Sequence, residues 1–239
     1  MRPATTAPRR LLQVVSPSGE SIAVALKRNP RARRLVLSVD PAEAAAALVI
    51  PPFVSIGEAQ AFLDSRRDWL ANRLASVPAR CPFVDGAAIP FLGRTLILRH
   101  EEGARVPTRR LGEELVVGGA PEHLARRATD WLKREAKERF ATLALDKARA
   151  LGRPAPRVAV RDPRRQWGSC SANGTLRLSW RLVMAPEPVI DYVVAHEVAH
   201  LAEMNHSRAF WAHVARLTPH LSTARIWLRR HGQTLLRYG

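Results

Sequence analysis

The stretch that decides the fold is residues 189–201, which read VIDYVVAHEVAHL. Its apolar residues predict a buried helix, and the pattern H-E-x-x-H falls at His196, Glu197 and His200. Four residues span little more than one helical turn, so both histidines project from the same face. Two imidazoles placed in this way can bind one Zn²⁺ ion, and Glu197 lies beside the ion, where it can accept a proton from water. The alternative is that the histidines are exposed polar residues of an amphipathic helix.

A catalytic zinc site needs a third protein ligand and one open position. His206 is the predicted third ligand, because it follows the expected end of the helix at a point where the chain can turn back. Glu203 is the competing candidate, although it is expected to be still helical. The spacing of the three histidines matches that of metzincins. Metzincins, however, have glycine at the position of Glu203 and a later Met-turn, and neither is recognisable here.

A β-hairpin is predicted just before this helix. Its strands cover residues 166–170 and 175–180, and the Asn-Gly pair at 173–174 between them is a strong hairpin signal. A strand beside a metal-binding helix can pair with an extended peptide. Gly168 would then let a substrate backbone come close, and Trp167 would line the pocket. Packing of the hairpin onto the helices is the alternative role for Trp167.

Four further polar side chains are candidates for the site. Arg165 and Arg177 could bind a substrate carboxylate or phosphate, and the alternative is that they lie on a solvated strand face. Tyr192 could donate a hydrogen bond to an oxyanion, and core packing is its alternative role. Asp191 could orient a ligand histidine, but a charge near the helix N-terminus explains it equally well.

The rest of the chain is expected to alternate short strands with helices. Expected strands cover 11–15, 21–26, 34–39, 48–50, 94–99, 114–117 and 157–161, and helices are expected at 55–77, 121–152, from 207, and at 222–231. Ser55 and Glu58 form a capping-box pattern. Glycine and proline at 152–156 mark the expected internal boundary. The expected parts are therefore a basic tail at 1–10, a β-rich and helical portion at 11–152, and a catalytic core at 153–239.

Composition excludes several classes of protein. The chain has 239 residues, of which 46% are hydrophobic and 25% charged, as in ordinary globular proteins. No apolar run is long enough for a membrane span, and the start does not read as a signal peptide. Two cysteines cannot form a disulfide framework or a four-cysteine zinc module, so a cytoplasmic location is expected.

The net charge of +17 has two interpretations. A basic surface attracts nucleotides or nucleic acid, and residues 205–239 contain six arginines but no acidic residue. The alternative is that the arginine excess reflects the base composition of a genome.

Several blocks of the sequence are similar to the YgjP-like metallopeptidase family, which groups with M48 and SprT-type zincins. They are RQWGSC at 165–170, GTLRL at 174–178, IDYVVAHEVAHL at 190–201, NHS at 205–207 and FW at 210–211. The basic segment 31–34 and the prolines at 51–52 extend the similarity toward the N-terminus. The resemblance implies an α+β zincin-like fold with an antiparallel sheet packed on the H-E-x-x-H helix. It also implies one zinc ion per chain on His196, His200 and His206, with Glu197 as general base.

The expected function is therefore that of a zinc-dependent metallopeptidase acting on a peptide or protein. Two alternatives stay open. Clustered arginines also suit phosphate, so a zinc-dependent hydrolase of nucleotides or other phosphoanhydrides is the first. A nucleic-acid-associated protease is the second, because residues 205–239 lack acidic side chains.

Overall fold

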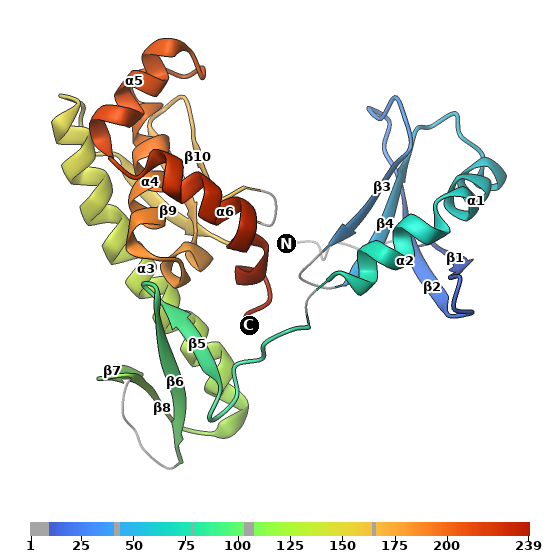
Figure 1. Cartoon of the computed structure of the whole chain (residues 1–239), viewed down its shortest axis with the longest axis horizontal. Coiled ribbons are helices and arrows are strands. Elements are labelled where there is room, and N and C mark those ends of the chain that lie inside the picture. Colours follow the sequence, from blue (N-terminus) through green and yellow to red (C-terminus); the bar gives the residue numbers. More distant parts are fainter. Residues whose placement is uncertain (1–9, 41–43, 78, 103–107, 164–165) are drawn as a thin grey trace, which may run out of the picture. The chain divides into compact units, whose positions relative to one another are not determined.

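The computed structural model of the chain describes residues 10–40, 44–77, 79–102, 108–163 and 166–239. The chain forms two compact units, Met1–Ala79 and Arg80–Gly239 (Figure 1). The boundary expected at residues 152–156 lies inside the second unit, and the division falls at Ala79 instead. Apart from Arg10, the predicted basic tail at 1–10 lies outside the described residues.

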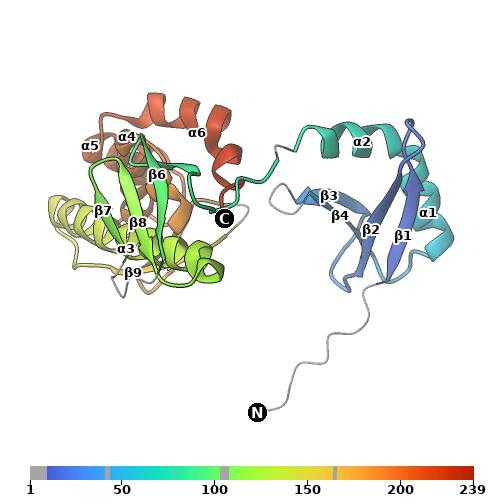
Figure 2. The same ribbon diagram turned by 90° about the horizontal axis from the view of Figure 1, so that it is seen from below.

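The first unit is a four-stranded sheet with two helices (Figure 2). Its elements are β1 (Leu11–Val15), β2 (Ser21–Arg28), β3 (Val36–Asp40), β4 (Ala45–Ile50), α1 (Ile56–Ser65) and α2 (Arg67–Ala75). The strand order is β1-β2-β4-β3, in which β2 and β4 are parallel and the other neighbours are antiparallel. Alternate strand residues such as Leu12, Val24 and Leu48 are buried, together with Leu63 and Leu70 of the helices. One face of this sheet therefore forms the core of the unit.

The helix expected at 55–77 is divided in two at Arg66. The backbone N–H of Arg66 bonds to the carbonyls of Leu63 and Asp64, which closes α1 before α2 begins. The predicted capping box is confirmed: Ser55 Oγ accepts from the N–H of Glu58 at 3.2 Å, and the N–H of Ser55 donates to the Glu58 carboxylate at 2.8 Å.

The second unit begins with a mixed sheet and a long helix. The sheet contains β5 (Ala88–Phe91), β6 (Arg94–Glu101), β7 (Arg109–Leu111) and β8 (Glu114–Gly118) in the order β5-β6-β8-β7. A 3₁₀ turn, η1 (Pro121–His123), leads into α3 (Leu124–Ala150). This long helix packs against β8, β9, η2 and α4, and it buries Leu132, Phe140 and Ala144 completely. It is the scaffold on which the C-terminal half is built.

The C-terminal half contains a small sheet and three helices. Its elements are β9 (Arg157–Arg161), β10 (Gly168–Cys170), β11 (Thr175–Ser179), η2 (Trp180–Met184), α4 (Glu187–Ala199), α5 (Arg208–Leu217) and α6 (Leu221–Leu235). The predicted hairpin is confirmed as the antiparallel pair β10–β11, with Gly174 at a φ of 75° in its turn. The sheet beside α4 is nevertheless mixed, because β9 pairs with β11 in parallel. The architecture is α+β, as expected. Among the helices of the described residues, none has the length and apolar character needed to cross a membrane.

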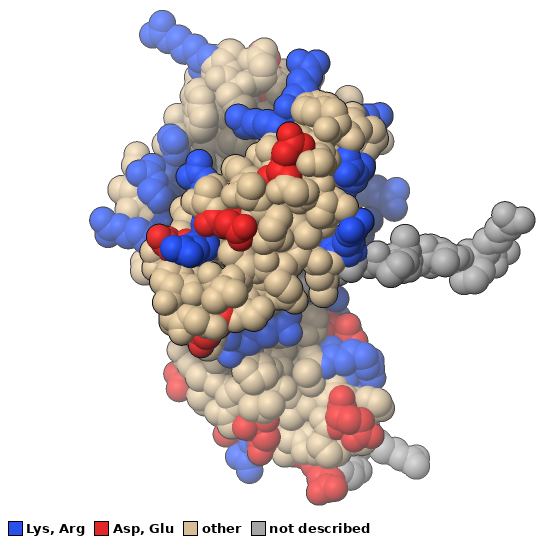
Figure 3. Space-filling model, turned by 90° about the vertical axis from the view of Figure 1, so that its right-hand side faces the viewer, with Lys and Arg blue, Asp and Glu red and all other residues tan. Residues whose placement is uncertain are grey.

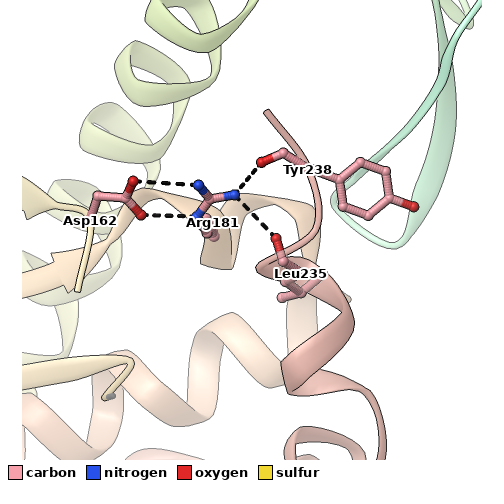
Figure 4. A network of polar contacts seen from close by, with 4 residues as sticks. All are labelled: Asp162, Arg181, Leu235 and Tyr238. Carbon is pink, nitrogen blue, oxygen red and sulfur yellow. Dashed lines mark hydrogen bonds and ion pairs between the residues drawn. The ribbon is translucent and has the colours of Figure 1, made fainter. Parts of the chain in front are cut away.

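Arg181 of η2 fastens the end of the chain to this core (Figure 4). Its Nε donates to Asp162 Oδ1 at 2.9 Å, and Nη1 donates to the carbonyls of Leu235 and Tyr238. The backbone of Tyr238 also pairs with that of Cys81, where the second unit begins. Because a guanidinium is costly to bury without partners, these bonds explain how Arg181 can be only 8% exposed.

We expect a fragment of residues 80–239 to unfold cooperatively in urea, and a fragment of residues 153–239 to show no cooperative transition. The shorter fragment lacks α3, whose Leu132, Phe140 and Ala144 belong to the same hydrophobic core as α4. Far-UV circular dichroism against urea concentration checks both. A sigmoidal transition in the shorter fragment would contradict this assignment of the core.

Candidate metal centre

Helix α4 lies in the interior because its sequence is apolar on almost every side. Ile190, Val194, Ala195 and Val198 are fully buried, and the helix contacts α3, α5, α6 and β10. A helix of this composition has to be covered by other elements. Glu197 is carried inward with it and is 5% exposed. A carboxyl group is therefore held in an apolar interior on the residue that follows His196.

Three histidines converge at the end of α4. His196 belongs to the last turn of the helix, His200 is its C-cap, and His206 lies in the loop before α5. One ring nitrogen of each lies within 4.8 Å of the others, and the Nε2 atoms of His196 and His206 are 3.1 Å apart. Three converging imidazole nitrogens are the donor set of many catalytic zinc sites. The residues present therefore fit a bound zinc ion.

The loop that carries His206 is held by caps on both sides. Helix α4 ends at Ala199, four residues earlier than expected, and the chain turns back at once. The side chain of Asn205 accepts from the N–H of Ser207 at 2.9 Å. Ser207 Oγ in turn accepts from the N–H of Phe210 at 3.3 Å, which caps α5. Local hydrogen bonds thus fix where His206 stands relative to the start of α5.

Two aromatic residues of α5 pack against the histidines. The ring of Phe210 lies 4.9, 4.5 and 4.7 Å from the rings of His196, His200 and His206. Trp211 lies 5.9 Å from the ring of His206, nearly parallel to it. These contacts orient the imidazoles, a role that sequence reasoning did not assign to either residue. The N-cap pattern at Ser207 could have predicted this role, because it places Phe210 in the first turn of α5, close to His206 in the sequence.

The surroundings favour unprotonated imidazoles. Burial, aided by the nearby His200, His206 and Arg225, lowers the pKa of His196 to about 4. Burial also lowers the pKa of His200. Since a metal binds the unprotonated form, these two side chains are in the binding form at neutral pH.

Glu203 serves the site through its main chain. The Nδ1–H of His200 donates to the carbonyl oxygen of Glu203 at 3.0 Å, which leaves Nε2 of His200 for a ligand bond. Glu203 was the competing third ligand in the sequence, on the expectation that it is helical. It lies beyond the end of α4, and the cluster found among the described residues contains His206 and not Glu203.

Glu197 lies against the strand β10. A Cβ atom added to Gly168 would lie 2.6 Å from both Cγ and Oε1 of Glu197, closer than two such atoms can come. The space over Gly168 that was expected to admit a substrate backbone is therefore taken by Glu197. Burial raises the pKa of Glu197 to about 7. A carboxyl group with this pKa can accept and release a proton near neutral pH.

Asp191 connects α4 to its neighbours. Among the described residues, no hydrogen bond joins it to a histidine, which was its candidate role. Its carboxylate lies 2.6 Å from Lys147 Nζ of α3 and accepts from Thr218 Oγ1 at 2.5 Å. Lys147 also donates to the carbonyl of Leu217 at 2.9 Å. This largely buried network joins α3, α4 and the end of α5.

Three further residues of the hairpin and of α4 are buried or half-buried. Trp167 is half-buried against α6, where a Cβ atom on Gly232 would lie 3.1 Å from its ring. Cys170 is half-buried, and burial together with the charge of Glu197 raises the pKa of its thiol. Tyr192 is 7% exposed, with its ring 6.1 Å from that of His196, and burial raises its pKa. Trp167 thus has the packing contact that was its alternative role.

Of the predicted arginines, Arg177 is exposed on β11, and Arg165 lies outside the described residues. A different arginine approaches the centre. Arg225 of α6 lies over Trp211, with its Cζ 5.5 Å from the ring centroid, and its charge lowers the pKa of His196. Sequence reasoning placed Arg225 only in the acid-free C-terminal segment. Its place near the histidines depends on how α6 folds back, for which no short motif exists.

Comparisons with known proteins found one matching family and two similar solved structures. A family described as the YgjP-like metallopeptidase domain matches residues 33–231. The solved structure of the metallopeptidase zymogen abylysin from Pyrococcus abyssi is 24% identical, with 39% of this chain and 93% of that chain covered and a TM-score of 0.35. The zymogen jannalysin from Methanocaldococcus jannaschii is 18% identical, with 40% and 96% covered and a TM-score of 0.34. A search of curated protein sequences found no match.

We expect the substitution Gly168→Ala to leave the chain folded and its metal content unchanged, but to lower peptide hydrolysis about 100-fold. The new methyl group would clash with Cγ, Cδ and Oε1 of Glu197 and displace its whole side chain, and a displacement of about 1 Å costs this much in a group that transfers protons. Thermal unfolding, metal content and hydrolysis of casein measure the three quantities. Ser169→Ala is the matched control, because successive residues of a strand point to opposite faces. Unchanged hydrolysis in Gly168→Ala would contradict the importance of this contact.

Proposed function

This chain belongs to the YgjP-like metallopeptidase family, and we propose that His196, His200 and His206 hold one zinc ion for the hydrolysis of peptide bonds. The observation that carries the proposal is the convergence of three ring nitrogens, together with a buried carboxyl group on Glu197, the residue that follows His196. Three protein ligands leave the fourth position of zinc open, as catalysis requires.

When bound, zinc supplies Lewis-acid activation of water and of the scissile carbonyl. The protein supplies the proton transfers. Glu197 takes a proton from the attacking water and delivers it to the nitrogen of the leaving amine. Burial raises the pKa of this carboxyl group above its ordinary value, which makes it a stronger base than an exposed glutamate. Because Gly168 has no side chain, the carboxylate of Glu197 can occupy the space beside it.

We propose that three side chains interact with negative charge on the substrate. Tyr192 lies on the same helix as His196 with its ring 6.1 Å away, and we propose that its hydroxyl donates to the developing oxyanion. Arg225 is exposed over Trp211 and is proposed to bind a carboxylate of the substrate. Arg177 is exposed on β11 and is proposed as a more distant contact of the same kind.

The strand β10 is proposed to align the substrate. It is at the edge of its three-stranded sheet and pairs only with β11 among the described strands. An extended peptide can add to such an edge through main-chain hydrogen bonds. Because Gly168 of β10 touches Glu197, a peptide along this edge would pass close to the proposed general base. The substrate is therefore proposed to be a polypeptide in an extended conformation.

The alternatives from the sequence receive less support. The family match favours peptide bonds over phosphoanhydrides. The nucleic-acid alternative rests on residues 205–239, and the family match gives it no support. Lys and Arg side chains lie among acidic and uncharged surface on the face drawn in Figure 3. Both cysteines, Cys81 and Cys170, are free thiols, and on this ground we propose a reducing compartment such as the cytoplasm.

We expect Glu197→Gln to retain one zinc ion per chain and to lose peptide hydrolysis by roughly 10²–10⁴-fold, because glutamine cannot accept the proton. We expect His206→Ala to lose most of its zinc, because two ligands hold the ion far less tightly than three. Mass spectrometry of metal content and casein hydrolysis on the same samples check both.

The same samples are assayed with nucleoside triphosphates, and no metal-dependent phosphate release is expected. Wild-type hydrolysis by Glu197→Gln would contradict its role as general base. Full zinc content in His206→Ala would mean that another residue, such as Glu203, is the third ligand. Release of phosphate that is lost in Glu197→Gln would instead favour the phosphoanhydride alternative.

We expect Arg225→Ala to raise KM for acidic peptides while zinc content stays unchanged, because the charge that attracts a substrate carboxylate is lost. The matched control is Arg229→Ala, one turn further along α6 and also exposed. Steady-state kinetics on peptides with acidic or neutral side chains near the cleaved bond make the comparison. An equal effect of the two substitutions would assign Arg225 to the general basic surface.

A further inference from the structure

The first unit has a pocket of its own, although all of the proposed zinc ligands belong to the other unit. Its volume is about 310 Å³, and it lies between the start of β3 and the junction of α1 with α2. Leu35, Val36 and Leu37 line one side, and Phe62 and Trp69 line the other. The pocket is therefore mainly apolar, and it is of a size that can accept one large side chain.

Parts of this pocket are unusually exposed for apolar groups. Trp69 is 45% exposed and Val36 is 43% exposed, whereas the neighbouring Leu63 and Leu70 are completely buried. The unit therefore has a full core and leaves a tryptophan outside it. An exposed aromatic residue beside a pocket is a common feature of protein interaction sites.

The pocket adjoins an open sheet edge. In the strand order β1-β2-β4-β3, β3 is the last strand and pairs only with β4 among the described strands. Its outer main-chain groups therefore face away from the sheet, and such groups bind an added strand. A strand added here would run past Val36 and place alternate side chains toward the pocket. The apolar pocket and the open edge thus suit the same kind of ligand, an extended polypeptide.

The rim of the pocket is basic. Arg34 and Arg66 line it, and Cζ of Arg66 lies 5.8 Å from the ring centroid of Phe62. Arg31 and Arg33 are exposed just before β3. The described residues that line the pocket include no acidic side chain. This charge complements a peptide that carries carboxylates on either side of its apolar residue.

We propose that β3 and this pocket form a docking site for an extended, acidic segment of a protein substrate, which adds to the sheet beside β3 and places one large apolar side chain in the pocket. The site is separate from the one proposed to cleave the chain, and it can bind whether or not the zinc chemistry is as proposed above. Its effect is to hold a long substrate by a segment away from the cleaved bond, which raises the local concentration of that substrate.

The test measures binding directly. A fluorescein-labelled peptide of about eight residues, in which leucine alternates with glutamate, is titrated with the full chain carrying Glu197→Gln, so that it is not consumed. Saturable fluorescence anisotropy is expected. We expect Trp69→Ala to weaken binding about tenfold or more, and Arg66→Glu to weaken it about tenfold. Arg73→Glu is the matched control, because Arg73 is an exposed arginine of α2 outside the pocket and should leave affinity unchanged.

Two altered peptides examine the mode of binding. Replacement of every glutamate by lysine should abolish binding, because the rim is basic. N-methylation of alternate residues should also abolish it, because the methyl groups remove the main-chain donors that pair with β3. Thermal unfolding of each variant shows whether it is folded. Because Trp69 and Arg66 are exposed, both variants are expected to keep the wild-type transition.

Four results would overturn the proposal. The first is that the peptide does not bind, and the second is that the wild type, Trp69→Ala and Arg66→Glu bind it with equal affinity. The third is tight binding of the N-methylated peptide. The fourth is that His196→Ala loses binding while Trp69→Ala retains it. Two further results would assign the pocket to another occupant. One is that oligothymidylate of about ten nucleotides binds and Trp69→Ala abolishes this binding. The other is that sedimentation shows a dimer that Trp69→Ala dissociates.

Discussion

The chemistry of the candidate site in the second unit depends on the burial of Glu197. A carboxylate in an apolar interior is unfavourable, and the rise of its pKa to about 7 expresses this cost. Among the described residues, no cationic side chain forms an ion pair with Glu197. Gly168 of β10 leaves room for the side chain, and burial also lowers the pKa of the preceding residue, His196, so that its imidazole is unprotonated at neutral pH. The result is a group that can exchange a proton at neutral pH.

The sequence predicted those parts of the site that local chemistry determines. The H-E-x-x-H spacing placed His196 and His200 on one face of a helix, and the Asn-Gly turn predicted the hairpin that contains Gly168. The main-chain role of Glu203 was not predicted, because it depends on where α4 ends. Arg225 and Phe210 were not assigned to the site, since their positions follow from the packing of α5 and α6 onto α4. Tertiary contacts of this kind leave no fixed spacing in the sequence.

Domain organisation was harder to predict for a related reason. Glycine and proline at 152–156 end a long helix, which is a strong local signal, but α3 belongs to the same core as the elements that follow. The true division at Ala79 is accompanied in the sequence only by Pro78 and Pro82. What separates two units is the scarcity of contacts between them, and this is a property of the folded chain.

The pairing of Cys81 with Tyr238 has a consequence for how the two units are joined. The first and last residues of the second unit are hydrogen-bonded neighbours, and Arg181 holds the last residues to the core. A unit whose ends meet in this way can be inserted into a host loop or circularly permuted without cutting through its interior. The second unit is thus suited to recombination with other modules, and exchange of the first unit at this point would leave the proposed zinc ligands in place.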